Sequence, residues 1–355
     1  MTFNHIVFSI NNDYAPYLYI CLKSLLTHIK PCDKYKACIL YTELSDHHQE
    51  NLLNLQTDNL KIEFINVETI IRKYKDNFSI NNHFTIETYY RFFLPRIFPK
   101  LDKVLYLDAD TMIMKDISPL FNIDINGYYL GVTHDCEIVR ASNFIRTKYS
   151  NYFIKTLNID PSNYFQAGVM LVNLKKMRED NITDKLLDAL ERIGSPKFVD
   201  QDILNTVCRD KVLFIPQNWN YTWHLQFCDS DYLEHLPDYF RTSYKEAEDD
   251  PYIIHFTGNK MKPTNYPNAL YASVFWNYAQ NTPYYSLLIE QKEQYFKEVQ
   301  KIKSKISIKI KKYKILNMIS LGLFKSKYHK KIEKREEDLS RIKKYTEKEN
   351  NEPKK

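Results

Sequence analysis

The sequence predicts an α/β protein built on a Rossmann-like, mostly parallel sheet with helices on both faces. Strand-like and helix-like patterns alternate over its first 110 residues, as expected for a doubly wound sheet. An apolar run of strand length, 103–107, then ends in the paired carboxylates Asp108 and Asp110. Ligands of open α/β sheets bind beyond the carboxyl ends of the strands, so we expect a site at these carboxylates.

The expected elements follow one another with short connections. The first 110 residues contain expected strands at 4–10, 37–41, 61–67 and 104–107, with helices at 17–26, 45–55 and 85–98 between them. Later strands are expected at 128–132, 168–174, 212–215 and 252–256, and later helices at 175–193, 200–207 and 266–279. We therefore predict one catalytic domain over residues 1–282, followed by a tail over residues 283–355.

The charge of the chain is concentrated at its C-terminal end. The whole chain has a net charge of +6, whereas residues 292–355 carry 21 Lys and Arg against 9 Asp and Glu. Within residues 301–331 there are 11 lysines and no acidic residue, with Ile302, Ile306, Ile310 and Tyr313 at helical spacing. Such a basic amphipathic segment is typical of membrane-surface anchors, so we expect a largely helical, membrane-associating tail with a disordered end.

Several classes of protein are disfavoured by composition. The six cysteines form no CxxC pair, and no apolar run reaches the length of a transmembrane helix or a signal peptide. With only six glycines, the chain contains neither GxGxxG nor a P-loop. The tail has two arginines and few aromatic residues, so no nucleic acid is expected as a partner. We expect a cytoplasmic protein at the inner face of the plasma membrane.

The strongest chemical signal is the Asp108-Ala109-Asp110 segment. Side chains two residues apart on an extended backbone point the same way, so the two carboxylates can converge on one divalent cation. The alternative is a pair of solvated carboxylates in a turn, because a lone D-x-D is common. His255 ends a later apolar strand and is either a third metal ligand or a core histidine.

Three further segments carry polar groups near expected strand or helix ends. Asp200, Gln201 and Asp202 begin a helix, where they either cap it or contact a sugar. Gln166 precedes small residues at the start of a strand, which suggests close backbone packing. Arg91 lies among aromatic residues and is either functional or a surface arginine along aromatic neighbours.

Taken together and in order, these segments resemble the family 8 retaining glycosyltransferases. The resemblance runs from His5 to Pro267 and rests on the segments IVFSINNDYAPYL, TIETYYRFFLP, DKVLYLDADTMIMKDISPLF, FQAGVMLVNLKKMR, DQDILN, IPQNWNY and IHFTGNKMKP. This family includes bacterial lipopolysaccharide galactosyl- and glucosyltransferases and the glycogenins. It implies a GT-A fold, Mn²⁺ or Mg²⁺, and hexose transfer from a UDP-sugar with retention at the anomeric carbon.

The resemblance also implies roles for individual residues. The implied metal ligands are Asp108, Asp110 and His255, and the implied catalytic residues are Asp200 and Gln201. The implied donor-binding residues are Asn11, Asp13, Tyr14, Arg91, Asp108, Ala109, Asp110, Gln166, Gly258, Lys260 and Lys262. Tyr14 would stack on the uracil, and Lys262, with Lys260 as the alternative, would contact the diphosphate.

The sequence departs from the family pattern at three places. Asn11 replaces the usual Asp, and its amide oxygen can still accept from the uracil N–H. Gln166 replaces the usual Asn, which leaves the donor hexose open. The H-x-x-G-x-x-K-P-W motif is one residue longer and has Thr264 in place of Trp.

The predicted reaction is transfer of glucose or galactose to a lipid-linked or oligosaccharide acceptor, such as a lipopolysaccharide or lipooligosaccharide core. Because Gln201 is a poor nucleophile, we favour front-face attack, with Gln201 and Asp200 stabilising the oxocarbenium-like state. One alternative is a haloacid-dehalogenase-type phosphatase, in which an apolar strand ends in D-x-D-x-T, a pattern that Leu105 to Thr111 fits. That family places the motif near the start of its domain and needs a later acidic pair after an apolar strand, whereas Asp249-Asp250 follows a polar run. The other is a non-catalytic, sugar-nucleotide-binding relative.

Overall fold

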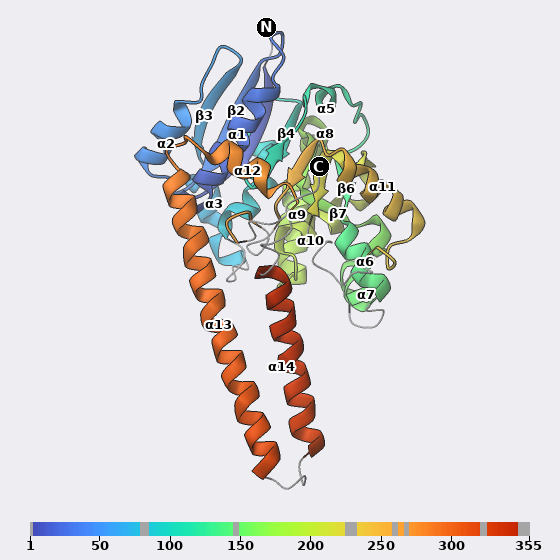
Figure 1. The fold of residues 1–355 in the computed structure, drawn as a ribbon. Coiled ribbons are helices and arrows are strands. Elements are labelled where there is room, and N and C mark those ends of the chain that lie inside the picture. Colours follow the sequence, from blue (N-terminus) through green and yellow to red (C-terminus); the bar gives the residue numbers. More distant parts are fainter. Residues whose placement is uncertain are drawn as a thin grey trace. The chain divides into compact units, whose positions relative to one another are not determined.

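The computed structural model describes residues 3–78, 85–144, 149–223, 233–257, 262–265, 270–319 and 325–346 (Figure 1). By its internal contacts the chain divides into two compact units, Met1–Gly258 and Asn259–Lys355. The division predicted from the sequence, at residue 282, stays a prediction.

The first unit is built on a mixed sheet. Among the described residues this sheet has seven strands, in the order β3-β2-β1-β4-β7-β6-β8. The strands are β1 (Asn4–Ser9), β2 (Tyr35–Tyr41), β3 (Leu60–Asn66), β4 (Lys103–Leu107), β6 (Leu130–His134), β7 (Phe165–Asn173) and β8 (Val212–Phe214). Only β7 runs antiparallel to its neighbours, β4 and β6, so the predicted mostly parallel α/β fold is confirmed.

A second, small sheet extends from the end of β4. Within the described residues it consists of β5 (Thr111–Ile113), β10 (Ile253–His255) and β9 (Tyr221–Thr222). β10 lies antiparallel to β5, with His255 opposite Thr111, and the Phe256 N–H donates to the Asp110 carbonyl at 3.0 Å. This pairing joins the turn after β4 to residues nearly 150 positions later in the chain.

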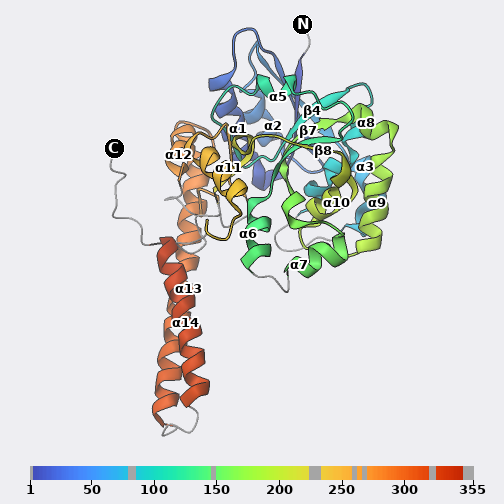
Figure 2. The ribbon, with the colours of Figure 1, turned by 90° about the vertical axis from the view of Figure 1, so that its right-hand side faces the viewer.

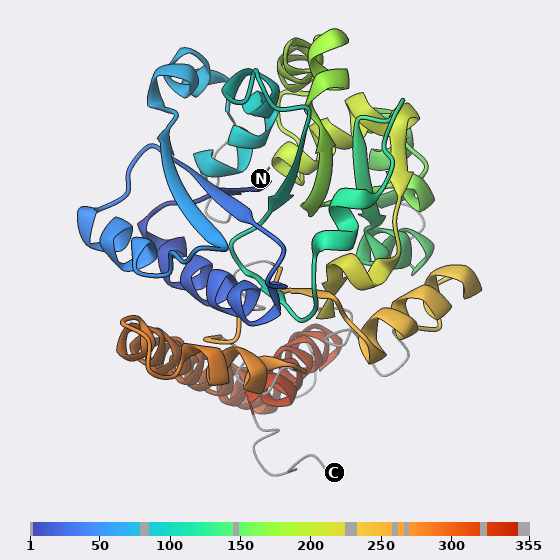
Figure 3. The same ribbon diagram turned by 90° about the horizontal axis from the view of Figure 1, so that it is seen from above.

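Helices cover both faces of the larger sheet. Figure 3 shows α1 (Ala15–His28) and α9 (Ile182–Ile193) on opposite sides of it. On one face, Val7 and Tyr106 of the central strands share a core with Leu186 of α9 and Ile203 of α10 (Val199–Cys208). The α-helices not yet given in this unit are α2 (Asp46–Leu53), α3 (Glu68–Ile71), α4 (Leu94–Ile97), α5 (Ser118–Asn122), α6 (Cys136–Phe144), α7 (Tyr149–Asn151), α8 (Leu174–Glu179) and α11 (Asp238–Asp249).

Short 3-10 helices and a π-helix connect these elements. The 3-10 helices are η1 (Asn12–Tyr14), η2 (Arg72–Asn77), η3 (Ile86–Phe93), η5 (Pro161–Asn163), η6 (Arg209–Lys211) and η7 (Gln217–Asn220). A π-helix, η4, spans Tyr152–Leu157.

Two predicted helices are interrupted in the structure. The helix expected at 85–98 is η3 followed by α4, because Pro95 has no N–H to continue the ladder and instead lies in the first turn of α4. The helix expected at 175–193 is α8 and α9, separated at Asn181, whose φ of +51° is left-handed. The strands expected at 128–132 and 168–174 lie at 130–134 and 165–173.

The second unit is helical in the part that the structure describes. It contains α12 (Ala272–Ala279) and two long helices, α13 (Tyr285–Ile319) and α14 (Lys325–Thr346), which lie side by side as an antiparallel hairpin (Figure 2). Ile306 and Ile310 of α13 pack with Ile332 of α14, and Lys314 pairs with Glu336 at 2.9 Å. The predicted apolar stripe is therefore used in part to join the two helices.

A different face of α13 presents apolar side chains to solvent. Ile308, Ile315 and Met318 are 62%, 56% and 78% exposed. None of the described helices combines the length and the apolar character that a membrane crossing requires. The predicted disordered end falls largely on residues 347–355, which lie outside the described residues.

Candidate active site

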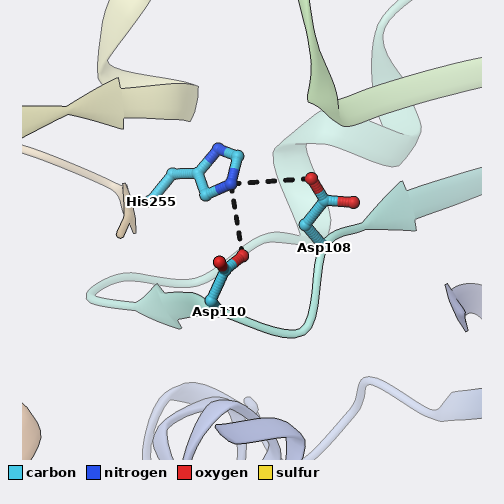
Figure 4. A group of neighbouring side chains, drawn as sticks. All are labelled: Asp108, Asp110 and His255. Carbon is cyan, nitrogen blue, oxygen red and sulfur yellow. Dashed lines mark ion pairs between the residues drawn. The ribbon is translucent and has the colours of Figure 1, made fainter. Parts of the chain in front are cut away.

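Three side chains that can bind a metal converge beyond the carboxyl end of β4. Asp108 and Asp110 lie in the turn between β4 and β5, and His255 ends β10. One ligand atom from each lies within 4.8 Å of the other two. Nε2 of His255 is 3.3 Å from Oδ1 of Asp110 and 3.6 Å from Oδ2 of Asp108, as Figure 4 shows.

Local hydrogen bonds hold this turn. The N–H and the hydroxyl of Thr111 both donate to the Asp108 carbonyl, at 3.2 and 2.8 Å. Two residues later, the Ile113 N–H donates to Oγ of Ser24 on α1 at 2.9 Å. The turn that carries the two carboxylates is thus held at the carboxyl end of β4 and against α1.

Arg91 is the cation beside Asp108. Its side chain is 5% exposed, and its guanidinium lies 4.4 Å from the centre of the Tyr106 ring. One terminal nitrogen donates to Oδ1 of Asp108 at 2.8 Å, and Nε lies 3.1 Å from Oδ2 of Asp200. The other terminal nitrogen donates to the Ala167 carbonyl at 2.7 Å. Arg91 therefore joins η3, β4, β7 and α10, which rules out a surface arginine.

The charges of this cluster alter the pKa values of its buried members. Burial raises the pKa of Asp200 to about 7; Arg91 opposes this shift, and Asp108 adds to it. Burial alone would lower the pKa of His255, but the hydrogen bond and charge of Asp110, with the charge of Asp108, raise it above its ordinary value. The imidazole of His255 thus faces two carboxylates, as a metal ligand would.

Gln166 contacts the histidine only through an intermediate residue. Its Oε1 accepts from the Gly168 N–H at 2.6 Å and from Nδ2 of Asn220 at 2.7 Å. Oδ1 of Asn220 in turn lies 3.1 Å from Nδ1 of His255. Sequence reasoning missed Asn220, because it gave the IPQNWNY segment no role of its own.

Gly168 is required by the close approach of the metal-site side chains. A Cβ built on it would lie 2.1 Å from Cε1 of His255 and 2.7 Å from Oδ2 of Asp108. No larger residue fits without moving them. This explains why the residue at 168, within β7, is a glycine, which the sequence alone could attribute only to close backbone packing.

Gln201 is held at both ends of its amide. Its Oε1 accepts from the Ala167 N–H at 3.0 Å, and its Nε2 donates to Oδ2 of Asp135 at 3.0 Å. Asp135 was also missed; it directly follows β6, and a strand-end carboxylate is a signal that could have identified it.

The first turn of α10 has a strained backbone. Val199 has a φ of +37°, which a β-branched residue rarely adopts. Asp202, fully buried, accepts from the Phe198 N–H at 2.8 Å and from the hydroxyls of Tyr152 and Tyr164. This Asp202 clamp holds the turn that presents Asp200 and Gln201. The prediction that one of these acids is the N-cap of the helix is wrong, because the N-cap of α10 is Phe198 and no side chain caps it.

The expected uridine-binding residues follow β1. Oδ1 of Asn11 accepts from the N–H groups of Asp13 and Tyr14, at 3.1 and 3.3 Å, and so caps η1. The oxygen expected to bind uracil is therefore already used in the cap. Burial, followed by the charges of Asp110 and Asp108, raises the pKa of Tyr14 well above its ordinary value.

The expected diphosphate contacts fall outside this geometry. Gly258 and Lys260 lie outside the described residues, and Lys262 belongs to the second unit. Their roles, and those of the other predicted donor contacts, stay predictions.

The side chains at the corner fit a divalent cation. Carboxylate oxygens suit both Mg²⁺ and Mn²⁺, whereas an imidazole nitrogen favours Mn²⁺, which is a transition metal. Because Oδ1 of Asp108 is engaged by Arg91, its Oδ2 faces the imidazole. Asp108, Asp110 and His255 would hold the ion. Three protein ligands are fewer than such an ion takes, so oxygens of the sugar donor could supply others.

Comparisons with known proteins agree with the fold and show the family. The model of the family described as "Glycosyl transferase family 8" matches residues 5–266. A Haemophilus influenzae protein assigned to the glycosyltransferases is 31% identical over 221 residues, which cover 61% of this chain and 63% of that protein. An Escherichia coli lipopolysaccharide 1,2-glucosyltransferase is 26% identical over 309 residues, covering 83% of this chain and 85% of the relative. The chain thus spans less than two thirds of the length of the Haemophilus influenzae protein.

Solved structures show the same architecture. The bifunctional glycosyltransferase WbbM aligns with a TM-score of 0.73 and 25% identity, over 82% of this chain and 52% of WbbM. The galactosyltransferase LgtC, solved with donor and acceptor sugar analogues, aligns with a TM-score of 0.64 and 25% identity, over 79% of this chain and 96% of LgtC. The GT-A fold predicted from the sequence is thereby confirmed.

Proposed function

Because the chain belongs to glycosyl transferase family 8, we propose that it is a retaining hexosyltransferase that uses a UDP-sugar and Mn²⁺ or Mg²⁺. The observation that carries the proposal is the convergence of Asp108, Asp110 and His255 at the carboxyl end of β4. Glucose or galactose is the proposed sugar, since one relative is named a glucosyltransferase and another a galactosyltransferase. The proposed acceptor is a lipid-linked or oligosaccharide glycan, such as a lipopolysaccharide core.

Charge stabilisation would supply most of the catalysis. When bound, a divalent cation supplies positive charge opposite the diphosphate that leaves the sugar. Arg91 holds Asp108 through Oδ1 and so orients Oδ2 toward the site. We expect Lys262, or Lys260 as the alternative, to add a further positive charge at the diphosphate.

The contacts of Gln201 favour front-face transfer. A double displacement needs a free nucleophile beneath the sugar. The amide oxygen of Gln201 already accepts from Ala167, and its nitrogen donates to Asp135. We therefore expect the acceptor hydroxyl to attack on the leaving-group side, with the departing phosphate oxygen as base and with Gln201 and Asp200 stabilising the oxocarbenium-like state. A covalent sugar trapped on Asp200 or Gln201 would overturn this mechanism.

The test is UDP release from a panel of UDP-sugars, with Mn²⁺ and with EDTA. We expect metal-dependent release from one UDP-hexose, reduced at least about 10³-fold by Asp110→Ala, since the substitution removes a proposed ligand. Asp102→Ala is the matched control, because Asp102 precedes the opposite end of β4 and its side chain is 79% exposed. It should leave release unchanged.

The family match and the same assay each address one of the two alternatives. The phosphatase alternative loses its basis, because its D-x-D-x-T motif falls within the region matched by the family model. The non-catalytic alternative predicts UDP binding, measured by calorimetry, without turnover of any donor, in either the presence or the absence of glycan acceptors.

We propose a membrane role for the second unit, and the exposed surface of α13 supports it. Lys311 and Lys312 lie at helical spacing between Ile308 and Ile315, and all four side chains are exposed. We expect this face of α13 to contact an anionic lipid surface, where each lysine contributes about 1 kcal/mol and salt weakens the attraction. A lipid-linked acceptor would be presented at the same surface.

Vesicle sedimentation tests this role. Wild-type protein should bind vesicles that contain anionic lipid, and the triple variant Ile308→Ser, Ile315→Ser, Met318→Ser should bind less. Ile302→Ser, at another exposed isoleucine of α13, is the control. Equal binding to neutral and anionic vesicles, or binding that the triple variant retains, would contradict the proposal.

A further inference from the structure

A line of hydrogen bonds leads from the backbone of β7 to the imidazole of His255. It begins at the Gly168 N–H, passes through the side-chain amides of Gln166 and Asn220, and ends at Nδ1 of His255. The three donor–acceptor distances are 2.6, 2.7 and 3.1 Å. We call this line the Gly168 relay.

The direction of the relay is determined by its first member. A backbone N–H can only donate, so the Gln166 atom that it meets must be the amide oxygen. That oxygen then receives the NH₂ group of Asn220, so the oxygen of Asn220 faces the histidine. Because this oxygen can only accept, Nδ1 of His255 must carry a proton.

The tautomer that results is the one that a metal site needs. With the proton on Nδ1, a neutral ring has its lone pair on Nε2, the nitrogen that lies 3.3 Å from Asp110 and 3.6 Å from Asp108. A ring with its proton on Nε2 alone would set two acceptors, Nδ1 and the Asn220 oxygen, against each other. Flipping the Asn220 amide to avoid this would forfeit its bond to Gln166.

Burial makes these bonds difficult to replace. Asn220 is fully buried and His255 is 2% exposed, so water is a poor substitute for either partner. The absence of a side chain on Gly168 is also necessary, since a Cβ there would lie 2.1 Å from Cε1 of His255. The relay is therefore specific to the geometry of this corner.

We propose that Asn220 and Gln166 are positioning residues that set the tautomer and orientation of His255 for a divalent cation. This inference rests on the metal-dependent function proposed above. Partners of metal-bound histidines act in this way in general, and their loss typically weakens metal affinity by about 10–100-fold.

Two measurements on the full chain test the proposal. The first is Mn²⁺ affinity by calorimetry in the presence of UDP, for wild type, Asn220→Ala, Asn220→Asp, Gln166→Leu and Gln166→Glu. Asn220→Ala should lose about 10–100-fold and Gln166→Leu a smaller factor. Gln166→Glu keeps the oxygen that accepts from Gly168 and Asn220, so it should retain the wild-type affinity within about threefold. Asn220→Asp keeps an acceptor for Nδ1–H but loses the donor to Gln166, so its affinity should fall between those of wild type and Asn220→Ala. A merely structural role for these side chains would not produce this rescue.

The second measurement needs no metal. Two-bond ¹H–¹⁵N spectra of the metal-free protein, recorded at a pH at which the ring is neutral, identify the protonated nitrogen of His255. We expect Nδ1–H in wild type and Nε2–H in Asn220→Ala, where Asp110 becomes the better acceptor. Asn218→Ala is the matched control, because Asn218 lies in the same turn, η7, and its side chain donates to the Asp250 carbonyl at 2.8 Å.

The outcomes separate this inference from the proposed function. Unchanged Mn²⁺ affinity in Asn220→Ala, or Nε2–H in wild type, would overturn the relay even if the enzyme is active. Absence of Mn²⁺ binding by wild type would overturn the proposed metal-dependent function, and the spectra would still decide the tautomer. If Asn220→Ala does not fold, Gln166→Leu makes the same distinction, because it removes the oxygen that orients the Asn220 amide.

Discussion

His134 and His255 both end strands of the same unit, yet their surroundings differ in kind. His134, at the end of β6, stacks on Phe214 with ring centres 3.6 Å apart, and burial lowers its pKa to about 4. His255, more deeply buried, has two carboxylates opposite Nε2, which raise its pKa despite burial. Burial alone therefore does not identify a candidate metal ligand; the neighbours of the ring do.

We expect the largest effect from removing Arg91, whose guanidinium pairs with Asp108, a carboxylate that also faces His255. Arg91→Leu would leave the buried Asp200, and Asp108 beside it, without their counter-charge. Breaking a buried ion pair typically costs about 3–5 kcal/mol, so we expect a loss of that size in the free energy of unfolding, measured with denaturant.

Arg91→Lys is the matched comparison for this prediction. It retains the charge but loses the planar arrangement of donors, so its loss of stability should be smaller. A leucine variant as stable as wild type would show that the carboxylates near His255 do not depend on Arg91.

A smaller effect is expected from crowding the ring of His255 while keeping every polar group. Gly168→Ala would place a methyl group 2.1 Å from Cε1 of His255 and so displace it. A misplacement of about 1 Å can cost about 100-fold in an assembled site, and we expect a loss of this order in Mn²⁺ affinity by calorimetry.

Gly131→Ala is the control for crowding. Its Cβ would meet its neighbours at 3.4 Å or more, so metal affinity should be unchanged. If both alanine variants bind Mn²⁺ equally well, the close packing against His255 is not required.

The smallest effect concerns His134 and pH. Its folded pKa of about 4 lies below the value near 6.5 of an unfolded histidine, so its contribution to stability is complete above pH 6.5. That contribution should be lost as the pH falls from 6.5 to about 4, and we expect a loss on the order of 2 kcal/mol.

The measurement is the free energy of unfolding of wild type and His134→Phe across this range. The difference between the two should change with pH, because phenylalanine does not titrate. A His134→Phe variant with the wild-type slope would show that the ring is not held neutral by its stack.

The first half of the larger sheet could be predicted from the sequence because its signals are local. Strands β1 to β4 each have a short apolar pattern, and Asp108 and Asp110 follow the last of them directly. His255 was also identified, since it ends an apolar strand. Family resemblance then assigned these three residues to one site.

The remaining parts of the site depend on contacts between distant residues. Asn220 meets Gln166 across 54 positions, and Gln201 meets Asp135 across 66. No periodic pattern records such pairs. The three-residue strand β5 and the positive φ of Val199 were likewise missed, because tertiary contacts impose both conformations.

The strained turn at Val199 has a consequence for the order in which the protein folds. A β-branched residue in a left-handed conformation persists only when its surroundings impose it. Here the Asp202 clamp needs Tyr152 from η4 and Tyr164, which directly precedes β7, in their final places. The turn that presents Asp200 and Gln201 therefore forms late, after the sheet. On mild destabilisation, the turn at Val199 should open before the larger sheet does, so that a chain retaining most of its protected amides would already have lost the arrangement of Asp200 and Gln201.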